Sequence, residues 1–433
     1  MDIRKKLKIA VAMSGGVDSS VAAKLLYDQG HDVTGVFLYF WHEDNPSGAL
    51  KGRGGPENKC CSSGALLDAR RAAAKIGIRL LTLDFTKVFK KQVVDDFLSE
   101  YARGRTPNPC VRCNKLVKLG FLIKAARKLG FDYLASGHYA RLWPEIPNSK
   151  SSRRQDHATR RQSPKNAPQI TYKLYKAKDE NKDQSYFLHT LNQYALKHLL
   201  FPLGDYTKSE VRQMAKKFDL PVAEKPDSQE ICFVPDKNHN DFLKRHLKLK
   251  PGPIKLLTSP NPLLRKQGNA CPLGKEEIRG IKMFGKAIIP LTPFIKGEVF
   301  GKGRIIGRHQ GLPLYTIGQR KGINLGHGPF YAAKMDYKKN ILYVVGAKNE
   351  NKIFSRDLIA KNVDWISQTT PPARLNCQAM TRYRQKAVAC RLSKIKGGAY
   401  KVKFARPLRA IMPGQSVVFY RGWEVLGGGV IAK

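Results

Sequence analysis

The stretch Ala12-Met-Ser-Gly-Gly-Val-Asp-Ser19 decides the fold of this chain. A short apolar run over 9–13 precedes it, and a helical pattern over 20–27 follows it, with Gly30 as the C-terminal cap. A strand, a tight turn and a helix in this order point free backbone N–H groups at an anion, and the helix dipole adds about half a positive charge there. Glycines in the turn let the backbone approach such an anion closely.

The side chains of this loop favour a nucleotide as the anion. Ser14 and Ser19 can donate hydroxyl protons to phosphate oxygens, and Asp18 suits a magnesium ligand or a brace of the loop. No lysine follows the glycines, as it would in a Gly-Lys-Ser/Thr loop. The sequence resembles instead the loop of ATP pyrophosphatases, which implies that it holds the β- and γ-phosphates of ATP. An ordinary turn between a strand and a helix is the alternative.

Strand-like and helical patterns alternate over residues 1–140, which predicts an α/β fold with a parallel sheet of Rossmann-like type. The predicted strands after the first are 33–40, 79–83 and 133–136, and the predicted helices are 65–76, 88–101, 114–129 and, further on, 209–218 with Ser209 as its N-cap. Ligands bind beyond the carboxyl ends of such strands, so 14–19, Leu38 and 137–138 should share one rim. An adenine would lie near Leu38.

The length of 433 residues predicts two to four domains. We expect an ATP-pyrophosphatase domain over 1–235, a small mixed domain over 236–330 and a C-terminal β-barrel over 331–433, where short alternating runs indicate an antiparallel barrel or sandwich. The polar, basic stretch 144–169 interrupts the first domain and is expected to be a loosely held insert.

The charge balance predicts a polyanionic partner. Lys and Arg number 78 against 34 for Asp and Glu, a formal net charge of +44, and nucleic acid is the commonest partner of such a chain. An acidic membrane surface is the rival, but no basic amphipathic helix supports it. No apolar run approaches the ~18 residues of a membrane span, so we expect a cytoplasmic protein. Its eight cysteines should then be mostly reduced, and any that pair are expected to be catalytic.

Two cysteine-containing stretches are candidate reactive sites. Cys113, in the stretch 107–114, is expected at a helix start beside Arg112 and Lys115, where the dipole and the cations favour the nucleophilic thiolate. With Cys110 it also forms a Cys-x-x-Cys pair, but a zinc site needs two more ligands, and adjacent cysteines such as those at 60–61 chelate one zinc poorly. We therefore predict no metal bound by cysteine.

Cys232 follows a polar, turn-forming run over 225–231. Taken alone, such a residue is most often a buried, inert thiol. Together with a nucleotide loop and a second nucleophilic cysteine, it becomes a candidate sulfur carrier.

Six motifs in this order resemble the tRNA-specific 2-thiouridylases. The resemblance covers nearly the whole chain, and its motifs are 14–19, 104–109 with 113–115, 137–141, 182–188, 227–228 with 231–233, and 315–322, supported by 382–384 and 413–415 in the last domain. It implies an enzyme that uses ATP and Mg²⁺ to activate the C2 oxygen of the wobble uridine of a tRNA as an adenylate. Cys232 would carry a persulfide supplied by a donor protein, a cysteine desulfurase or a relay protein.

The resemblance also implies roles for individual residues. Sulfur would attack C2 and AMP would leave, while Cys113 would free the sulfur and pass through a transient disulfide with Cys232. The implied ATP-binding residues are Ala12, Met13, Ser14, Gly15, Gly16, Val17, Asp18, Ser19, Leu38 and Gly137. The implied contacts to the target base are Asn108, Pro109 and Cys110, and those to tRNA are His138, Lys182, Asp183, Gln184, Arg382, Tyr383 and Gln415. Without the resemblance, His138 would be interpreted as a core histidine and Arg382 as a surface cation.

The chain departs from the family pattern at three places. Cys110 stands where some members carry Asp, so it could act as a competing nucleophile; Ala12 stands where Gly is usual; and segments 144–169 and about 255–300, the latter with Cys271, are insertions. Two other functions fit the residues less completely. Another ATP pyrophosphatase would lack the two cysteine motifs in this order, and a non-catalytic RNA-binding or zinc module would not need the nucleotide loop.

Overall fold

A computed structural model describes residues 6–41, 62–145, 170–227, 231–234, 239–257, 304–326 and 328–432. The chain forms two compact units, Met1–Leu249 with Phe354–Lys433, and Lys250–Ile353. The expected domain boundaries near 235 and 330 stay a prediction. Cys60, Cys61, Cys271 and most of both insertions lie outside the described residues. No helix among the described residues is long and apolar enough to cross a membrane.

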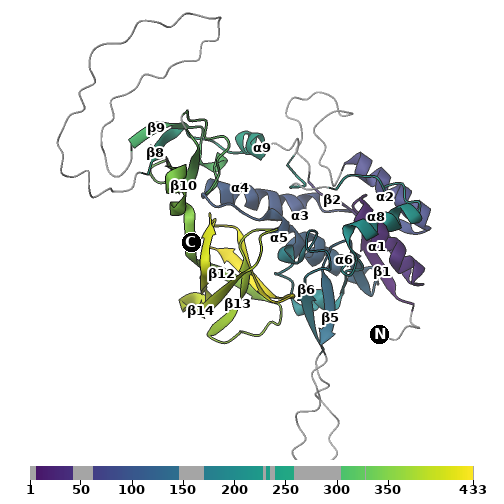
Figure 1. Ribbon diagram of the computed structural model, residues 1–433. Helices are drawn as coiled ribbons and strands as arrows, with labels where there is room; N and C mark the ends of the chain where they lie inside the picture. The colour runs from purple at the N-terminus through teal and green to yellow at the C-terminus, as the bar shows by residue number, and fades with distance from the viewer. Residues whose placement is uncertain are drawn as a thin grey trace, which may run out of the picture. The chain divides into compact units, whose positions relative to one another are not determined.

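The first unit contains the predicted parallel sheet (Figure 1). Its five strands have the order β3-β2-β1-β4-β7, with bounds β1 (Lys8–Ala12), β2 (Asp32–Tyr39), β3 (Arg79–Asp84), β4 (Tyr133–Ser136) and β7 (Leu199–Leu200). Six consecutive residues of β2 are buried, as expected for a strand covered on both faces. The strand order reverses at β1, between β2 and β4, and this reversal marks where α/β sheets bind ligands.

Helices cover this sheet. α1 (Val17–Asp28), α2 (Ser63–Ile76) and α8 (Lys208–Lys217) contribute buried side chains to one core with β1 and β2. In α2, the Ser62 hydroxyl caps the first turn by accepting a hydrogen bond from the backbone of Ala65. The N-cap of α8 is Thr207, in a capping box with Glu210, so the expectation of Ser209 was wrong by two positions. The Thr-x-x-Glu pattern satisfies two backbone donors and therefore fixes the start.

Two long helical segments contain π-helical turns. The first comprises α3 (Thr86–Phe89), η1 (Lys90–Val94) and α4 (Asp95–Ala102), and the second α5 (Pro109–Cys113), η2 (Asn114–Phe121) and α6 (Leu122–Lys128). The second begins five residues before the predicted start, because Asn108 caps it through its side chain and proline suits the first helical position. Cys113 is therefore the last residue of α5 rather than the first of a helix.

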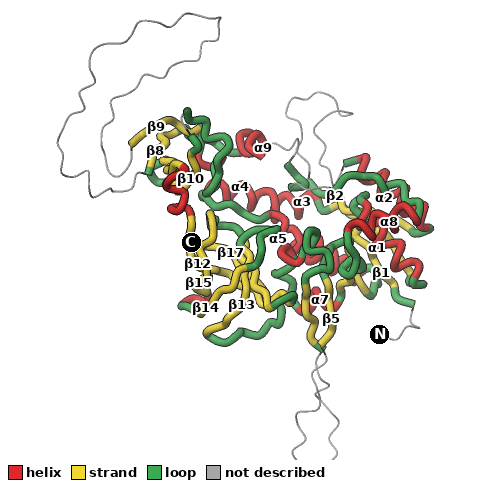
Figure 2. Tube along the Cα trace, in the orientation of Figure 1, coloured by secondary structure: helices red, strands yellow, loops and turns green. Residues whose placement is uncertain are grey.

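The C-terminal part of the first unit is a closed antiparallel barrel, as predicted (Figure 2). The strands run in the order β12-β15-β14-β13-β16-β17, and pairing of β12 with β17 closes the ring. Their bounds are β12 (Phe354–Trp365), β13 (Arg374–Met380), β14 (Val388–Lys394), β15 (Tyr400–Arg409), β16 (Ser416–Arg421) and β17 (Glu424–Ile431). Alternate side chains of β15 enter the barrel core, where Trp365 stacks on Phe419.

A hairpin from the N-terminal part of the first unit joins this barrel. Its strands are β5 (Arg141–Glu145) and β6 (Thr171–Tyr175), and β6 pairs with β17. The short helices η4 (Ser185–Phe187), α7 (Gln193–Lys197), α9 (His239–His246) and η9 (Lys396–Gly398) also belong to this unit. The hairpin therefore belongs to the same hydrogen-bonded sheet as the barrel strands, whereas the parallel sheet is separate from it.

The second unit is built on a four-stranded sheet of order β10-β11-β8-β9. The bounds are β8 (Gly252–Leu256), β9 (Arg304–His309), β10 (Phe330–Asp336) and β11 (Ile341–Gly346), with η7 (Leu312–Leu314) and η8 (Ala347–Ile353). Gln319 fixes the turn in the 315–322 motif, because its side-chain oxygen accepts hydrogen bonds from the backbone and hydroxyl of Thr316.

Candidate active site

The loop over 14–19 lies between β1 and α1, as predicted. Gly15 has φ +68°, and a Cβ there would lie 2.1 Å from the Ala65 carbonyl oxygen, so no other residue fits. Ser19 accepts a hydrogen bond from the Ser14 backbone at 3.2 Å and donates one to the Gly16 carbonyl at 3.2 Å. The loop is thus held closed by its own serine, with the start of α1 open to an anion.

Cations and carboxylates alternate beside the loop. Lys208, nearly buried, donates to Asp18 at 2.6 Å and to Asp227 at 2.9 Å. Lys182 and Arg212 also donate to Asp227, at 2.6 and 2.8 Å. Burial alone would raise the pKa of Asp227, but hydrogen bonds from Lys182 and Lys208 outweigh it and lower the pKa to about 2. Asp227 is therefore an anion that gathers three cations beside the loop over 14–19.

A further lysine reaches the loop from the stretch that precedes Cys232. Lys225 donates to the Gly15 carbonyl oxygen at 2.8 Å and to Asp68 at 2.6 Å. The Tyr139 hydroxyl donates to Asp18 at 2.8 Å from the other side. These contacts show that three distant parts of the chain fix the position of the loop.

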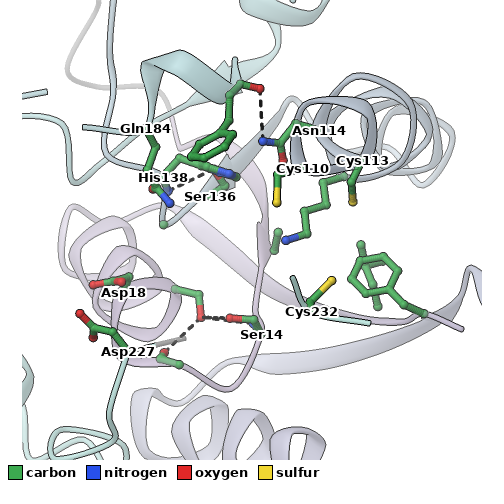
Figure 3. A pocket seen from close by; sticks show the side chains of 18 of the residues that line it. Ser14, Asp18, Cys110, Cys113, Asn114, Ser136, His138, Gln184, Asp227 and Cys232 are labelled. Atoms are coloured by element: carbon green, nitrogen blue, oxygen red, sulfur yellow. Dashed lines mark hydrogen bonds between the residues drawn. The ribbon is translucent and has the colours of Figure 1, made fainter. Parts of the chain in front are cut away.

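Cys232 is held between two anchors. On one side, Asp227 makes the ion pairs described above. On the other, Phe233 is buried in an aromatic cluster with ring centroids 5.2 Å from Phe97 and 5.8 Å from Phe89. The Cys232 side chain between these anchors faces the same hollow as Cys110 and Cys113 (Figure 3).

The helical turn η2 brings Lys118 to the thiols. At ~100° per residue, an α-helix would place a residue five positions after Cys113 about 140° away from it. The i→i+5 bonding of a π-helix stacks position i+5 over position i instead. Lys118 accordingly lines the hollow, with its Nζ 5.9 Å from the Phe40 ring centroid. Gly120 permits the widened turn, since a Cβ there would lie 2.4 Å from the Lys115 carbonyl oxygen.

His138 is a neutral, half-buried group at the rim. Its Nδ1 lies 2.7 Å from the Ser136 hydroxyl at the end of β4. Burial, with a smaller contribution from the nearby Lys118 ammonium, lowers the pKa of His138 to about 3. The imidazole can therefore donate or accept a hydrogen bond at neutral pH but carries no charge.

These groups surround one cavity of about 450 Å³, a size that suits a small-molecule ligand. Beyond the thiols and the loop over 12–19, its walls include Leu38, Pro109, Lys118, Gly137, His138, Lys182, Gln184, Phe187, Lys225, Tyr383 and Arg384. Tyr383 belongs to the loop between β13 and β14 and packs on Phe187 with ring centroids 4.5 Å apart. The barrel therefore supplies one wall of the cavity.

Comparison with known proteins identifies the chain. The family models described as "tRNA methyl transferase HUP domain", "tRNA methyl transferase PRC-barrel domain" and "Aminomethyltransferase beta-barrel domain" match residues 7–236, 293–346 and 355–431. The tRNA-specific 2-thiouridylase MnmA of Carboxydothermus hydrogenoformans is 40% identical over all of both chains. This chain belongs to the tRNA-specific 2-thiouridylase family.

Two further relatives have the same name as the first. The chain is 40% identical to the MnmA of Roseiflexus castenholzii over 98% of this chain and 99% of that one, and 38% identical to the MnmA of Moorella thermoacetica over 97% and 98%. Among solved structures, NMN synthetase from Francisella tularensis aligns with a TM-score of 0.28 and 13% identity, over 52% of this chain and 67% of that one.

The predicted site residues of this 2-thiouridylase chain divide into two groups. Those that line the cavity are 12–19, Leu38, Pro109, Cys110, Cys113, Gly137, His138, Lys182, Gln184, Cys232 and Tyr383. Asn108, Asp183, Arg382 and Gln415 are not among its walls, and their side chains bond within the protein. Asn108 caps α5, Arg382 donates to the Ala410 carbonyl, and Gln415 donates to the Thr106 and Pro107 carbonyls at 3.1 Å.

Asp183 braces the wall behind the cavity. Its carboxylate accepts hydrogen bonds from the Ala177 backbone at 3.0 Å and the Ser185 hydroxyl at 2.8 Å. Burial raises the pKa of Asp183 against the effect of these donors. The next residue, Gln184, accepts from the backbone of Tyr139 at 3.0 Å and so ties this wall to the rim.

Sequence reasoning missed five cations at the site: Lys118, Lys208, Arg212, Lys225 and Arg384. Lys225 and Arg384 lie inside the quoted stretches 225–231 and 382–384, but neither was assigned a role in the site. No signal in the sequence pointed to Lys208, because it lies about 190 residues from Asp18. Within the described part of the chain no cluster of three His, Cys, Asp or Glu side chains could hold a metal ion.

Proposed function

We propose that this protein catalyses ATP-dependent 2-thiolation of the wobble uridine in a tRNA anticodon. One observation carries the proposal: a loop suited to pyrophosphate and the thiols of Cys110, Cys113 and Cys232 line one cavity. An amide-like carbonyl such as C2 of uridine is a poor electrophile, so the reaction needs both activation of the oxygen and a sulfur nucleophile. The cavity is lined by residues suited to both.

In the proposed first step, the C2 oxygen of the uridine attacks the α-phosphorus of ATP, forming the C2–O–AMP adenylate and releasing pyrophosphate. The backbone of 14–19 would hold the β- and γ-phosphates, with Lys182, Lys208 and Lys225 close enough to neutralise them. Mg²⁺ would be held by the phosphates and Asp18, because magnesium commonly uses one or two protein carboxylates, and would supply further charge neutralisation.

In the second step, the terminal sulfur of a Cys232 persulfide attacks C2, and AMP leaves with the oxygen. The Cys113 thiolate then attacks the Cys232 sulfur. The bond between that sulfur and the sulfur on C2 breaks, which releases 2-thiouridine, and a Cys113–Cys232 disulfide forms. A dithiol reductant then reduces this disulfide and regenerates both thiols. Alternatively, Cys113 attacks the persulfide first and releases hydrosulfide as the nucleophile.

The uridine must leave its stack to enter such a cavity. Tyr383 and Phe187 offer an aromatic wall for it, and Pro109 and Cys110 lie beside the nucleophile. His138, Lys182 and Gln184 would contact the tRNA from the rim, whereas Asn108, Asp183, Arg382 and Gln415 would act mainly by positioning. The proposed partners are tRNA and a persulfide-donating desulfurase or relay protein, and the proposed location is the cytoplasm.

The test uses the purified chain with labelled ATP, Mg²⁺, unmodified tRNA and a persulfide source. We expect AMP together with a sulfur-for-oxygen mass gain in the anticodon. Cys113→Ser and Cys232→Ser should each lower thiolation by at least about 10³-fold yet leave tRNA binding intact, because a hydroxyl is a far weaker nucleophile. Cys377→Ser, in the barrel, is the matched control in excess dithiothreitol.

Two results would contradict the proposal. Release of AMP without sulfur gain would indicate a different ATP pyrophosphatase, and wild-type thiolation by either pocket variant would remove that cysteine from the mechanism.

A further inference from the structure

Two cysteines outside the cavity face each other across neighbouring strands of the barrel. Cys377 in β13 and Cys390 in β14 are directly opposite in the antiparallel register. Their sulfur atoms lie 3.7 Å apart. Cys390 is 7% exposed and belongs to the barrel core, whereas Cys377 is half-buried at its edge. The proposed thiolation uses neither residue.

The strand register at this pair is compatible with a disulfide. Directly opposite residues of antiparallel strands have Cα atoms about 4.5–5.5 Å apart, within the roughly 4.4–6.8 Å that disulfides span. A bond therefore requires only that side-chain rotation bring the sulfurs from 3.7 Å to about 2.05 Å. The strands themselves need not move.

The pair lies in the stem of the hairpin whose tip forms one wall of the cavity. β13 ends at Met380 and β14 begins at Val388, and the residues between them include Tyr383 and Arg384. A covalent bond between Cys377 and Cys390 would close the segment that carries these two cavity residues. The dithiol is thus placed to restrain the tip without contacting a substrate.

We propose that Cys377 and Cys390 are a modification site, a dithiol that a hydroperoxide oxidises to a reversible disulfide. The half-buried Cys377 sulfur attacks the peroxide, breaks its O–O bond, and becomes a sulfenic acid while alcohol or water leaves. The Cys390 sulfur then displaces the sulfenic hydroxyl as water and loses its proton. In total, two thiols and one hydroperoxide give one disulfide, one alcohol (or water) and one water.

The surroundings of the two sulfur atoms determine which of them attacks the peroxide first. The hydrogen bond with Cys377, together with burial, raises the pKa of Cys390 well above its ordinary value. Cys390 therefore stays a thiol that peroxide barely reaches, and Cys377 reacts first. A reducing compartment keeps the pair open, so the disulfide would mark oxidative stress and would be reversed by a dithiol reductant.

The test treats the full-length, reduced chain with increasing hydrogen peroxide, blocks remaining thiols and maps peptides without reduction. We expect a peptide cross-linked through residues 377 and 390 that disappears after dithiothreitol and is absent in Cys377→Ser and Cys390→Ser. Closing this short loop should also raise Tm by roughly a few degrees in the wild type but not in Cys377→Ser.

Three outcomes would overturn the inference: Cys377 oxidised to sulfinic or sulfonic acid without a cross-link, either cysteine cross-linked to a cavity thiol, or no reaction at peroxide levels that oxidise Cys113. If Cys390→Ser does not fold, Cys377→Ser decides the test, because its side chain is half-buried. None of these outcomes bears on whether the protein thiolates tRNA, so the two proposals fail separately.

Discussion

At the scale of single residues, two histidines with lowered pKa values make the stability of the fold decrease at acid pH. His189 is 1% exposed, and its Nδ1 lies 2.9 Å from the Tyr186 carbonyl oxygen. Burial lowers the pKa of His189 to about 4, and burial with Lys118 lowers that of His138 to about 3. Both side chains are therefore neutral in the folded protein at pH values where an unfolded chain would bind protons.

The sign of the pH dependence follows from this difference. Below the unfolded pKa near 6.5 the unfolded chain binds more protons, so stability is complete above about pH 6.5 and falls as the pH drops toward 4. Each histidine contributes a slope of up to about 1.4 kcal/mol per pH unit. We expect the free energy of unfolding of His189→Gln to fall less steeply as the pH drops, by up to about 1.4 kcal/mol per pH unit. Urea unfolding from pH 8 to 4 measures this slope. At pH 8, the difference in unfolding free energy between the variant and the wild type gives the packing cost alone. The same slope in both proteins would contradict the prediction.

Residues of the site were predictable where they are contiguous in sequence. The loop over 14–19 carries its own glycines and serines, so its chemistry could be interpreted without a fold. Lys208 could not be found, because only the packing of α8 on α1 brings its ammonium to Asp18. The bracing roles of Asp183 and Gln415 were equally hidden, since both depend on which backbone groups lie nearby in the fold.

At the scale of elements, the barrel loop over 413–415 fixes the segment that leads into α5. The Thr106 backbone donates to the Pro413 carbonyl at 2.8 Å, and Gln415 donates to the carbonyls of Thr106 and Pro107. Gly414 has φ +92°, and a Cβ there would lie 2.9 Å from the backbone nitrogen and oxygen of Thr106. The position of the Cys110 and Cys113 helix therefore depends on close approach of the barrel.

We expect Gly414→Ala to destabilise the protein by about 2–4 kcal/mol, because the left-handed backbone strain adds to a clash with backbone atoms. It should also lower kcat for thiolation by displacing α5. Gly422→Ala is the matched control: Gly422 has φ +58° in the same barrel but open space around a Cβ, so it should show the strain alone. Equal midpoints of urea unfolding for the two variants would contradict the clash.

The elements themselves were largely predictable from the sequence. Short continuous apolar runs located the parallel strands, and alternating hydrophobic patterns located the barrel strands, because a period of two is visible in a single strand. The π-helical turns η1 and η2 were not predictable, since they leave a helical pattern nearly unchanged. The start of α5 was missed for a different reason: two prolines at 107 and 109 indicated a loop, whereas the second occupies the first turn of a helix.

At the scale of the whole molecule, the excess of 44 positive charges should dominate tRNA binding. Each phosphate that a lysine or arginine neutralises releases counterions, so affinity falls steeply with salt. We expect the Kd for tRNA to rise at least about tenfold between 50 and 200 mM KCl. Fluorescence anisotropy measures this, with Tm recorded at each salt concentration to show that the chain stays folded. A Kd independent of salt would contradict an electrostatic role for the charge.

The first unit is assembled from both ends of the described sequence, and this has a consequence for biosynthesis. When a ribosome has made residue 353, the nucleotide loop and the cavity thiols exist, but the barrel wall with Tyr383 and Arg384 does not. At about 5–20 residues per second, that wall follows within seconds. The nascent polypeptide therefore emerges with its cavity thiols before their enclosure, and the proposed activity would be acquired late in translation.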